Sequence, residues 1–175
     1  MFFGKGIGAE VNTDSKYRHV VSALEKGEFD ILHFSTHGKY NKDHPLFSQI
    51  ELEDGLSLRP EDVGEMAVSF RQAKPIVILN TCQSGVQGFS ITEIKSWATQ
   101  FLDAGASVFI GTLWRVSDKA ALKFTKELYK HLSAGIALGE AVQKARTICK
   151  EPGDSSWLAY ELYGQPNSHI KLGPT

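Results

Sequence analysis

The sequence has few cysteines, no excess of either charge and no long hydrophobic run. Its 175 residues include two cysteines, Cys82 and Cys149, which are too few for a disulfide framework. Lys and Arg number 19 and Asp and Glu number 20, so the formal charge is −1. That balance gives no reason to expect nucleic acid or an anionic membrane as a partner. Apolar runs such as 76–79 and 108–110 are far shorter than the roughly 20 residues that cross a bilayer.

The start of the chain lacks the apolar stretch of a secretory signal, and with scarce cysteine this predicts a soluble cytoplasmic protein. Hydrophobic residues make up 42% of the sequence, which is enough for a packed core. The length fits one ordinary domain, so we expect a single domain over residues 1–175.

Strand-like apolar runs alternate with amphipathic, helix-like stretches. This alternation predicts an α/β fold whose mostly parallel central sheet is flanked by helices. The predicted strands are 29–34, 76–79 and 108–114, with a hairpin over 49–58 that turns at Asp54-Gly55. The predicted helices are 12–26, a short one from Pro60, 94–104, 119–134 and 138–149.

Capping residues set the expected helix ends. Thr13 or Asp14 can cap the first helix, and Gly27 ends it. Ser117 or Asp118 can cap the helix that follows residue 116 in the same way.

Reactive side chains follow two of the predicted strands. The first strand runs into Ser35-Thr36-His37-Gly38, and the strand 76–79 runs into Asn80-Thr81-Cys82-Gln83-Ser84-Gly85. Ligands gather at the carboxyl ends of parallel strands, so His37 and Cys82 are expected to face each other there. A thiolate is the working nucleophile of such a pair, and the imidazole generates it or protonates the leaving amine.

Other readings of these residues are weaker. His33 lies inside a strand and is expected to be a buried, hydrogen-bonded histidine, while Cys149 lies on an apolar helix face and is expected to be core. His33 and His37 are four residues apart, but zinc binding would need a helix between them and the sequence there favours strand and turn. The chain contains no G-x-S-x-G elbow, P-loop or dinucleotide glycine pattern.

Five segments, taken in order, resemble one known family. They are DILHFSTHG at 30–38, NTCQSG at 80–85, FLDAGA at 101–106, GTLWRVSD at 111–118 and WLAYELYGQP at 157–166. The first two look like the histidine and cysteine boxes of CHAT domains, which belong to the caspase–separase clan of cysteine peptidases. The resemblance spans about residues 28–166 and implies a three-layer caspase-like fold that lacks the N-terminal part of the family fold.

The resemblance also implies roles. Cys82 would attack the scissile carbonyl, His37 would protonate the leaving amine, and the backbone N–H groups of Gly38 and Cys82 would bind the oxyanion. Asp118 matches a separase aspartate that contacts the basic residue before the cut, and Trp114 would wall that pocket. The alternatives are a helix cap for Asp118 and a core position for Trp114.

The family therefore implies a cysteine endopeptidase that cleaves protein or peptide substrates after a basic residue, with no cofactor and no metal. CHAT domains are often attached to helical-repeat modules, so gating by such a partner is expected, with no direct contact to nucleic acid or membrane. Two rivals remain open at this point: a non-catalytic interaction domain that keeps the fold, and a thiol-based hydrolase or transferase that acts on small amides.

Overall fold

A single mixed sheet forms the centre of the computed structural model, which describes residues 2–4, 16–39, 48–66, 69–83 and 91–170. The strand order is β4-β3-β2-β5-β6-β7, and β1 pairs with β2 beside this path. The strands are β1 (Phe2–Gly4), β2 (Ile31–Lys39), β3 (Gln49–Glu51), β4 (Ser57–Leu58), β5 (Ile76–Gln83), β6 (Val108–Thr112) and β7 (Tyr160–Gly164). The three central strands β2, β5 and β6 run parallel, and the outer pairings are antiparallel.

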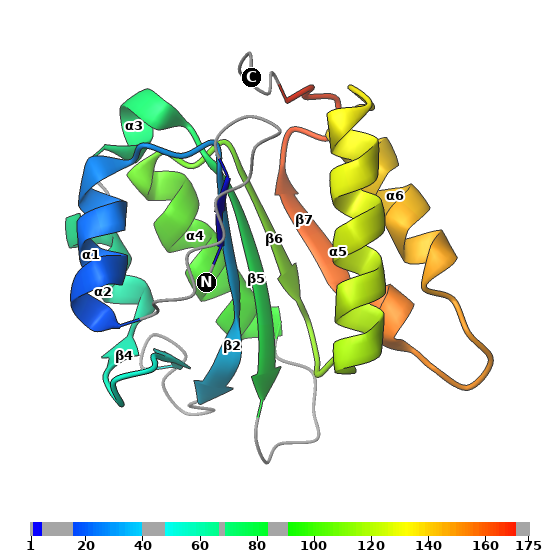
Figure 1. Ribbon diagram of the computed structural model, residues 1–175, viewed down its shortest axis with the longest axis horizontal. Coiled ribbons are helices and arrows are strands. Elements are labelled where there is room, and N and C mark those ends of the chain that lie inside the picture. Colours follow the sequence, from blue (N-terminus) through cyan, green and yellow to red (C-terminus); the bar gives the residue numbers. More distant parts are fainter. Residues whose placement is uncertain (1, 5–15, 40–47, 67–68, 84–90, 171–175) are drawn as a thin grey trace.

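Helices cover both faces of the sheet, which gives three layers (Figure 1). One face carries α1 (Tyr17–Lys26), α2 (Pro60–Met66), α3 (Phe70–Ala73) and α4 (Ile91–Ala104). The other carries α5 (Asp118–Ser133) and α6 (Leu138–Ile148), with a short 3-10 turn at Ser156–Leu158. The mostly parallel central sheet flanked by helices, and its compatibility with a caspase-like three-layer fold, are therefore confirmed.

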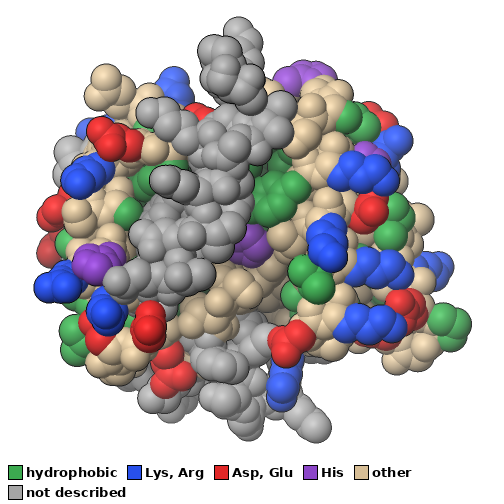
Figure 2. Space-filling view, in the orientation of Figure 1, with side chains coloured by type: hydrophobic (Ala, Val, Ile, Leu, Met, Phe, Trp, Pro, Cys, Tyr) green, Lys and Arg blue, Asp and Glu red, His purple; other side chains and the backbone are tan. Residues whose placement is uncertain are grey.

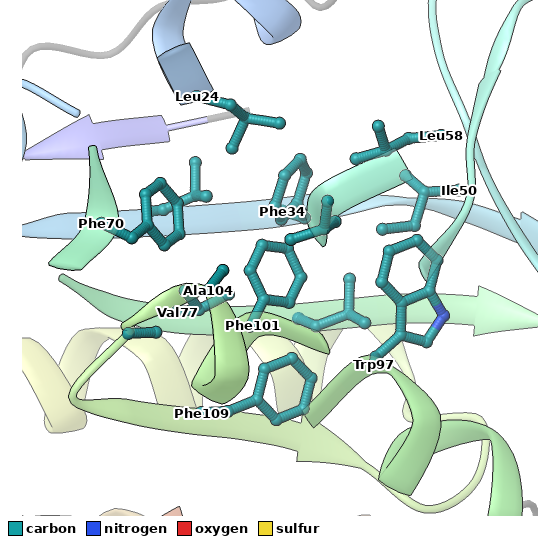
Figure 3. Close-up of a cluster of buried hydrophobic side chains, with 14 of the residues drawn as sticks. Leu24, Phe34, Ile50, Leu58, Phe70, Val77, Trp97, Phe101, Ala104 and Phe109 are labelled. Carbon is teal, nitrogen blue, oxygen red and sulfur yellow. The ribbon is translucent and has the colours of Figure 1, made fainter. Parts of the chain in front are cut away.

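Aromatic rings fill the layer between the sheet and α4 (Figure 3). Phe101 of α4 lies among them, and its ring centroid is 6.1 Å from that of Phe34 and 5.8 Å from that of Phe109. Trp97 stacks on the same ring at 6.0 Å. All four side chains are buried, so their packing fixes α4 over strands β2 and β6.

The opposite layer is built mainly from aliphatic side chains of α5 and α6. The inward residues of α5 recur at helical spacing, at Ala120, Phe124, Leu128 and Leu132. Phe124 stacks on Tyr160 of β7, which places α5 against the edge of the sheet. The predicted α6 face is buried as expected, with Leu138, Ala141, Val142, Ala145 and Cys149 inside.

Some element boundaries differ from the predicted ones. Helix α1 begins at Tyr17, its N-cap position is Lys16, and that side chain makes no capping bond. The proposed caps Thr13 and Asp14 lie outside the described residues. Gly27 does end the helix, in the left-handed conformation with φ of 60°.

Gly105 ends α4 where the chain passes close to α3. Its φ is +115°, and a Cβ built there would lie 2.6 Å from the backbone nitrogen of Arg71. A larger residue would therefore strain the backbone and push α3 away from α4. The predicted end of this helix at residue 104 is confirmed.

Charged side chains of both signs are interspersed over the helices on the face shown in Figure 2. Such a mixed surface suits a chain whose formal charge is close to zero. Among the described residues, no helix combines the length and the hydropathy that a bilayer crossing requires.

Candidate active site

The carboxyl ends of β2, β5 and β6 meet at one edge of the sheet (Figure 1). Strands β2 and β5 pair in parallel over eight residue pairs, from Ile31 with Ile76 to Gly38 with Gln83. The chain leaves β6 at the same edge and enters α5. Residues from three separate parts of the sequence are thus brought to one place, as expected for a site in an open parallel sheet.

His37 and Cys82 are Cα partners in the β2–β5 ladder. The predicted strand ends are wrong in one respect, because β2 continues to Lys39 and β5 to Gln83. Both residues therefore lie among the last residue pairs of the β2–β5 ladder and not in loops beyond it. Their side chains lie outside the described part of the structure, so the contact between thiol and imidazole stays a prediction.

Strand β5 extends beyond its pairing with β6. The last described β5–β6 pair is Leu79 with Gly111, whereas β5 runs on to Gln83 beside β2. Gly38, in contrast, has Cα partners on both sides, Ile50 of β3 and Gln83 of β5. None of the described strand pairings joins residues 80–83 of β5 to a strand on the side of β6. On that side, the edge of β5 near Cys82 faces the β6–α5 connection.

The β6–α5 connection carries the two residues expected to bind substrate. Trp114 is partly buried and packs against the α5–α6 layer, which fits the core alternative for this residue. Ser117 is the N-cap of α5, and its Oγ accepts a hydrogen bond from the backbone N–H of Ala120 at 3.3 Å. Asp118 is the exposed first residue of the helix, so the cap alternative for Asp118 is wrong.

His33 is a buried histidine held by hydrogen bonds, as predicted. Its Nδ1 lies 3.0 Å from the hydroxyl of Tyr129 and its Nε2 lies 3.0 Å from Nδ2 of Asn80. Burial lowers the pKa of His33 to about 4, so the ring is neutral near pH 7. This ring is therefore part of the structure below the site and is unsuited to act as the general base.

Cys149 has the packing role that its helical face predicted. Its side chain is buried, and the thiol donates to the backbone oxygen of Ala120 at 3.7 Å. Burial raises the pKa of the Cys149 thiol, which disfavours the thiolate. A reactive cysteine is therefore better sought at position 82.

A cavity of about 290 Å³ opens at the other end of the sheet. Ile76 and Val108, the first residues of β5 and β6, contribute to its wall, together with Lys74, Leu138 and Ile170. Because it lies at the amino ends of these strands, it is separated from His37 and Cys82 by the length of the sheet.

Sequence reasoning did not single out Asn80, Thr125 and Tyr129. Asn80 is buried in β5, and its Nδ2 reaches Oγ1 of Thr125 at 3.4 Å as well as His33. An asparagine at the end of an apolar strand, two residues before a candidate nucleophile, was the available signal. Thr125 and Tyr129 gave none, since they lie on a different, charged helix.

The fold and the paired strand positions define a caspase-like α/β domain. The family model of the CHAT domain matches residues 2–167, which is nearly the whole chain, and the chain therefore belongs to the CHAT family. This family is part of the caspase-like peptidase clan. A search of the curated proteins found no match.

Proposed function

We propose that this chain is a cysteine endopeptidase in which Cys82 is the nucleophile and His37 the general acid–base. The observation that carries the proposal is their pairing as neighbours in a parallel ladder, at the edge where such sheets place their reactive groups. Membership of a peptidase-related family supports the same roles.

In this mechanism the Cys82 thiolate attacks the carbonyl carbon of the scissile peptide. The C–S bond forms as the carbonyl electrons move to oxygen, and backbone N–H groups of Gly38 and Cys82 stabilise the oxyanion. When the C–N bond breaks, His37 gives its proton to the leaving amine. Water then attacks the thioester carbon as His37 takes its proton, the C–S bond breaks, and the new carboxylic acid product leaves the restored Cys82 thiolate.

The open side of β5 suggests where the substrate lies. A peptide beside residues 80–83 would run between β5 and the connection that carries Trp114 and Asp118. The carboxylate of Asp118 would then select Arg or Lys in the residue before the cut, because it can pair with a cationic side chain. Gating of this site by a helical-repeat partner is part of the same proposal and follows from the family's usual domain partners.

The test compares the two cysteines. Cys82→Ala is expected to abolish cleavage of peptides with arginine before the scissile bond, and to cost less than about 1.5 kcal/mol of stability. Cys149→Ala is the matched control: it removes a buried thiol, so it lowers the melting temperature but retains turnover. The readouts are peptide cleavage and thermal unfolding of both variants.

A peptide chloromethyl ketone with arginine next to the reactive carbon gives a second readout, by mass spectrometry. Selective alkylation of Cys82 in the folded chain supports the enzyme. Equal labelling of Cys82 and Cys149, or labelling of neither, contradicts it and favours a non-catalytic interaction domain. Cleavage of small amides without cleavage of a peptide library would instead favour the amide hydrolase.

A further inference from the structure

A chain of polar side chains crosses from the sheet to α5 directly below the candidate active site. It runs from the hydroxyl of Tyr129 to His33 Nδ1 at 3.0 Å, and from His33 Nε2 to Asn80 Nδ2 at 3.0 Å. Thr125, one turn before Tyr129 on α5, receives the second contact of Asn80 Nδ2, at 3.4 Å. These contacts tie β2, β5 and α5 together on the α5 side of the sheet.

Donor and acceptor chemistry fixes the direction of these bonds. The amide nitrogen of Asn80 has two N–H groups, and they point to His33 Nε2 and Thr125 Oγ1. His33 Nε2 must then accept, so the ring proton is on Nδ1 and is donated to Tyr129. Burial keeps both titratable groups uncharged near neutral pH, because it lowers the pKa of His33 and raises that of Tyr129.

The other end of the Asn80 amide lacks such a partner. Its Oδ1 is buried and accepts no hydrogen bond from the residues that the structure describes. The Asn80 residue as a whole is 8% exposed, so solvent does not readily satisfy this oxygen. A buried acceptor left without a donor costs about 1–3 kcal/mol, which is why such oxygens usually have a purpose or a partner.

The strand register places Asn80 opposite the midpoint between positions 33 and 37 of β2. Asn80 pairs with Ser35 across the β2–β5 ladder, so His33 and His37 lie two residues to either side of its partner. Cys82 lies two residues after Asn80 on β5. Side chains alternate along a strand, and positions separated by two share a face. Position 37 is therefore as many residues from the ladder partner of Asn80 as His33 is, and Asn80 contacts His33.

We propose that Asn80 is a positioning residue for the His37–Cys82 pair, whose Oδ1 accepts a hydrogen bond from a ring N–H of His37. This inference rests on the proposed function and deepens it. The donor side of the amide is held by His33 and Thr125, so Oδ1 is fixed in one direction. The bond would set the orientation and tautomer of the His37 ring and stabilise its protonated form, while no proton moves to Asn80.

The experiment measures the histidine rings by NMR in the full chain, together with turnover. In Asn80→Ala the pKa of His37 is expected to fall by about one pH unit, because an acceptor of its N–H is lost. The kcat is expected to fall about 10- to 100-fold with KM changed less than about threefold, as for a group that orients a general acid. Ser107→Ala is the control, since Ser107 makes its hydrogen bond to Pro75 at the other end of β5.

Asn80→Asp provides a second variant in case Asn80→Ala does not fold. It keeps an oxygen at the same place and adds charge, so the pKa of His37 should rise and kcat should stay closer to that of the wild type. If the pKa of His37 is unchanged in the variant that folds, the inference is overturned. An Nε2–H tautomer of His33 in the wild type also overturns it, because the amide would then present nitrogen to the site.

Failure of the proposed function looks different. A wild-type chain that cleaves no peptide, but whose His37 pKa still responds to substitution of Asn80, would contradict the peptidase and leave the hydrogen bond in place. A chain that cleaves peptides and whose His37 ignores Asn80 would contradict only the positioning role.

Discussion

At the scale of single residues, two histidines four positions apart have different places in strand β2. His33 is buried among hydrogen-bond partners, whereas His37 is a late position in the same strand, beside Cys82. The sequence predicted this division correctly for His33, because an aromatic base inside an apolar run has to be satisfied by neighbours. The identity of those neighbours depends on the packing of α5 on the sheet, which the sequence does not display.

The buried neutral state of His33 makes the stability of the fold depend on pH. Its pKa is about 4 in the folded chain, against 6.5 for an ordinary histidine. Between these values the unfolded chain takes up a proton that the folded chain excludes, so stability falls as the pH drops from about 6.5 to 4. Below pH 4 both states are protonated and the effect is complete, at about 3 kcal/mol.

The measurement is the free energy of unfolding of wild type and His33→Gln by urea titration at several pH values. Glutamine does not titrate, so the stability difference between the two proteins should shrink by about 3 kcal/mol between pH 7 and pH 4. His169→Gln provides the control for a histidine-to-glutamine change at an exposed site, outside the buried contacts of His33. A difference that stays constant from pH 7 to 4 would show that His33 is protonated equally in both states.

At the scale of elements, the register of the central strands agrees with the spacing of the two reactive residues in the sequence, although the predicted strand starts, 29 and 76, do not share that offset. Every described β2–β5 pair has the same offset, 76 − 31 = 45, and the offset between the two reactive residues is also 82 − 37 = 45. Two strands that begin in line must therefore place His37 beside Cys82. The sequence alone did not show that the strands continue through these residues, because 35–37 and 80–83 are polar and resemble loops.

Those polar segments become strand because neighbouring strands pair with them. Thr36 adds a side-chain bond of 2.7 Å to the backbone oxygen of Glu51 in β3. Pairing between segments far apart in sequence overrides local propensity, which is the general reason why strand ends are poorly predicted. The same reasoning explains β1 and β7, whose short segments gain their strand conformation from β2 and β6.

Two adjacent residues at the start of α5 have different roles: Ser117 caps the helix, and Asp118 is proposed to bind substrate. Ser117→Ala removes the N-cap bond to Ala120 and should cost about 1 kcal/mol without changing the preference for arginine peptides. Asp118→Asn keeps that cap and removes the favourable charge at the helix N-terminus, which is worth about 0.3–1 kcal/mol. If Asp118 selects the basic residue, its substitution should lower kcat/KM for arginine peptides about tenfold, or roughly 1.4 kcal/mol.

The measured quantity is the ratio of kcat/KM for matched peptides with arginine or glutamine before the cut. A lower ratio in Asp118→Asn and an unchanged ratio in Ser117→Ala would support the specificity role. An unchanged ratio in both variants would leave Asp118 as a residue of the helix terminus, and the basic preference would need another carboxylate.

At the scale of the whole molecule, two separate cores share one sheet. Residues 77 and 79 of β5 face the α4 layer, while 76 and 78 face the α5–α6 layer. Each central strand therefore contributes to both cores, and loss of either layer exposes the other side of the same strands. This arrangement is the physical reason to expect that the chain unfolds as one cooperative unit, in line with the predicted single domain.

A substitution in one core tests this coupling in the other. Phe101→Leu shortens a ring that contacts Phe34, Trp97 and Phe109, and should cost about 1–3 kcal/mol. Hydrogen exchange of peptides from α5 and α6, read by mass spectrometry, should then show the same loss of protection as peptides from α4. Leu122→Ala is the control, because Leu122 is 57% exposed on α5 and its loss should change stability by less than about 0.5 kcal/mol. If α5 and α6 kept their wild-type protection in Phe101→Leu, the two helical layers would open independently. The layer that contains α4 would then unfold while the α5–α6 layer stays folded.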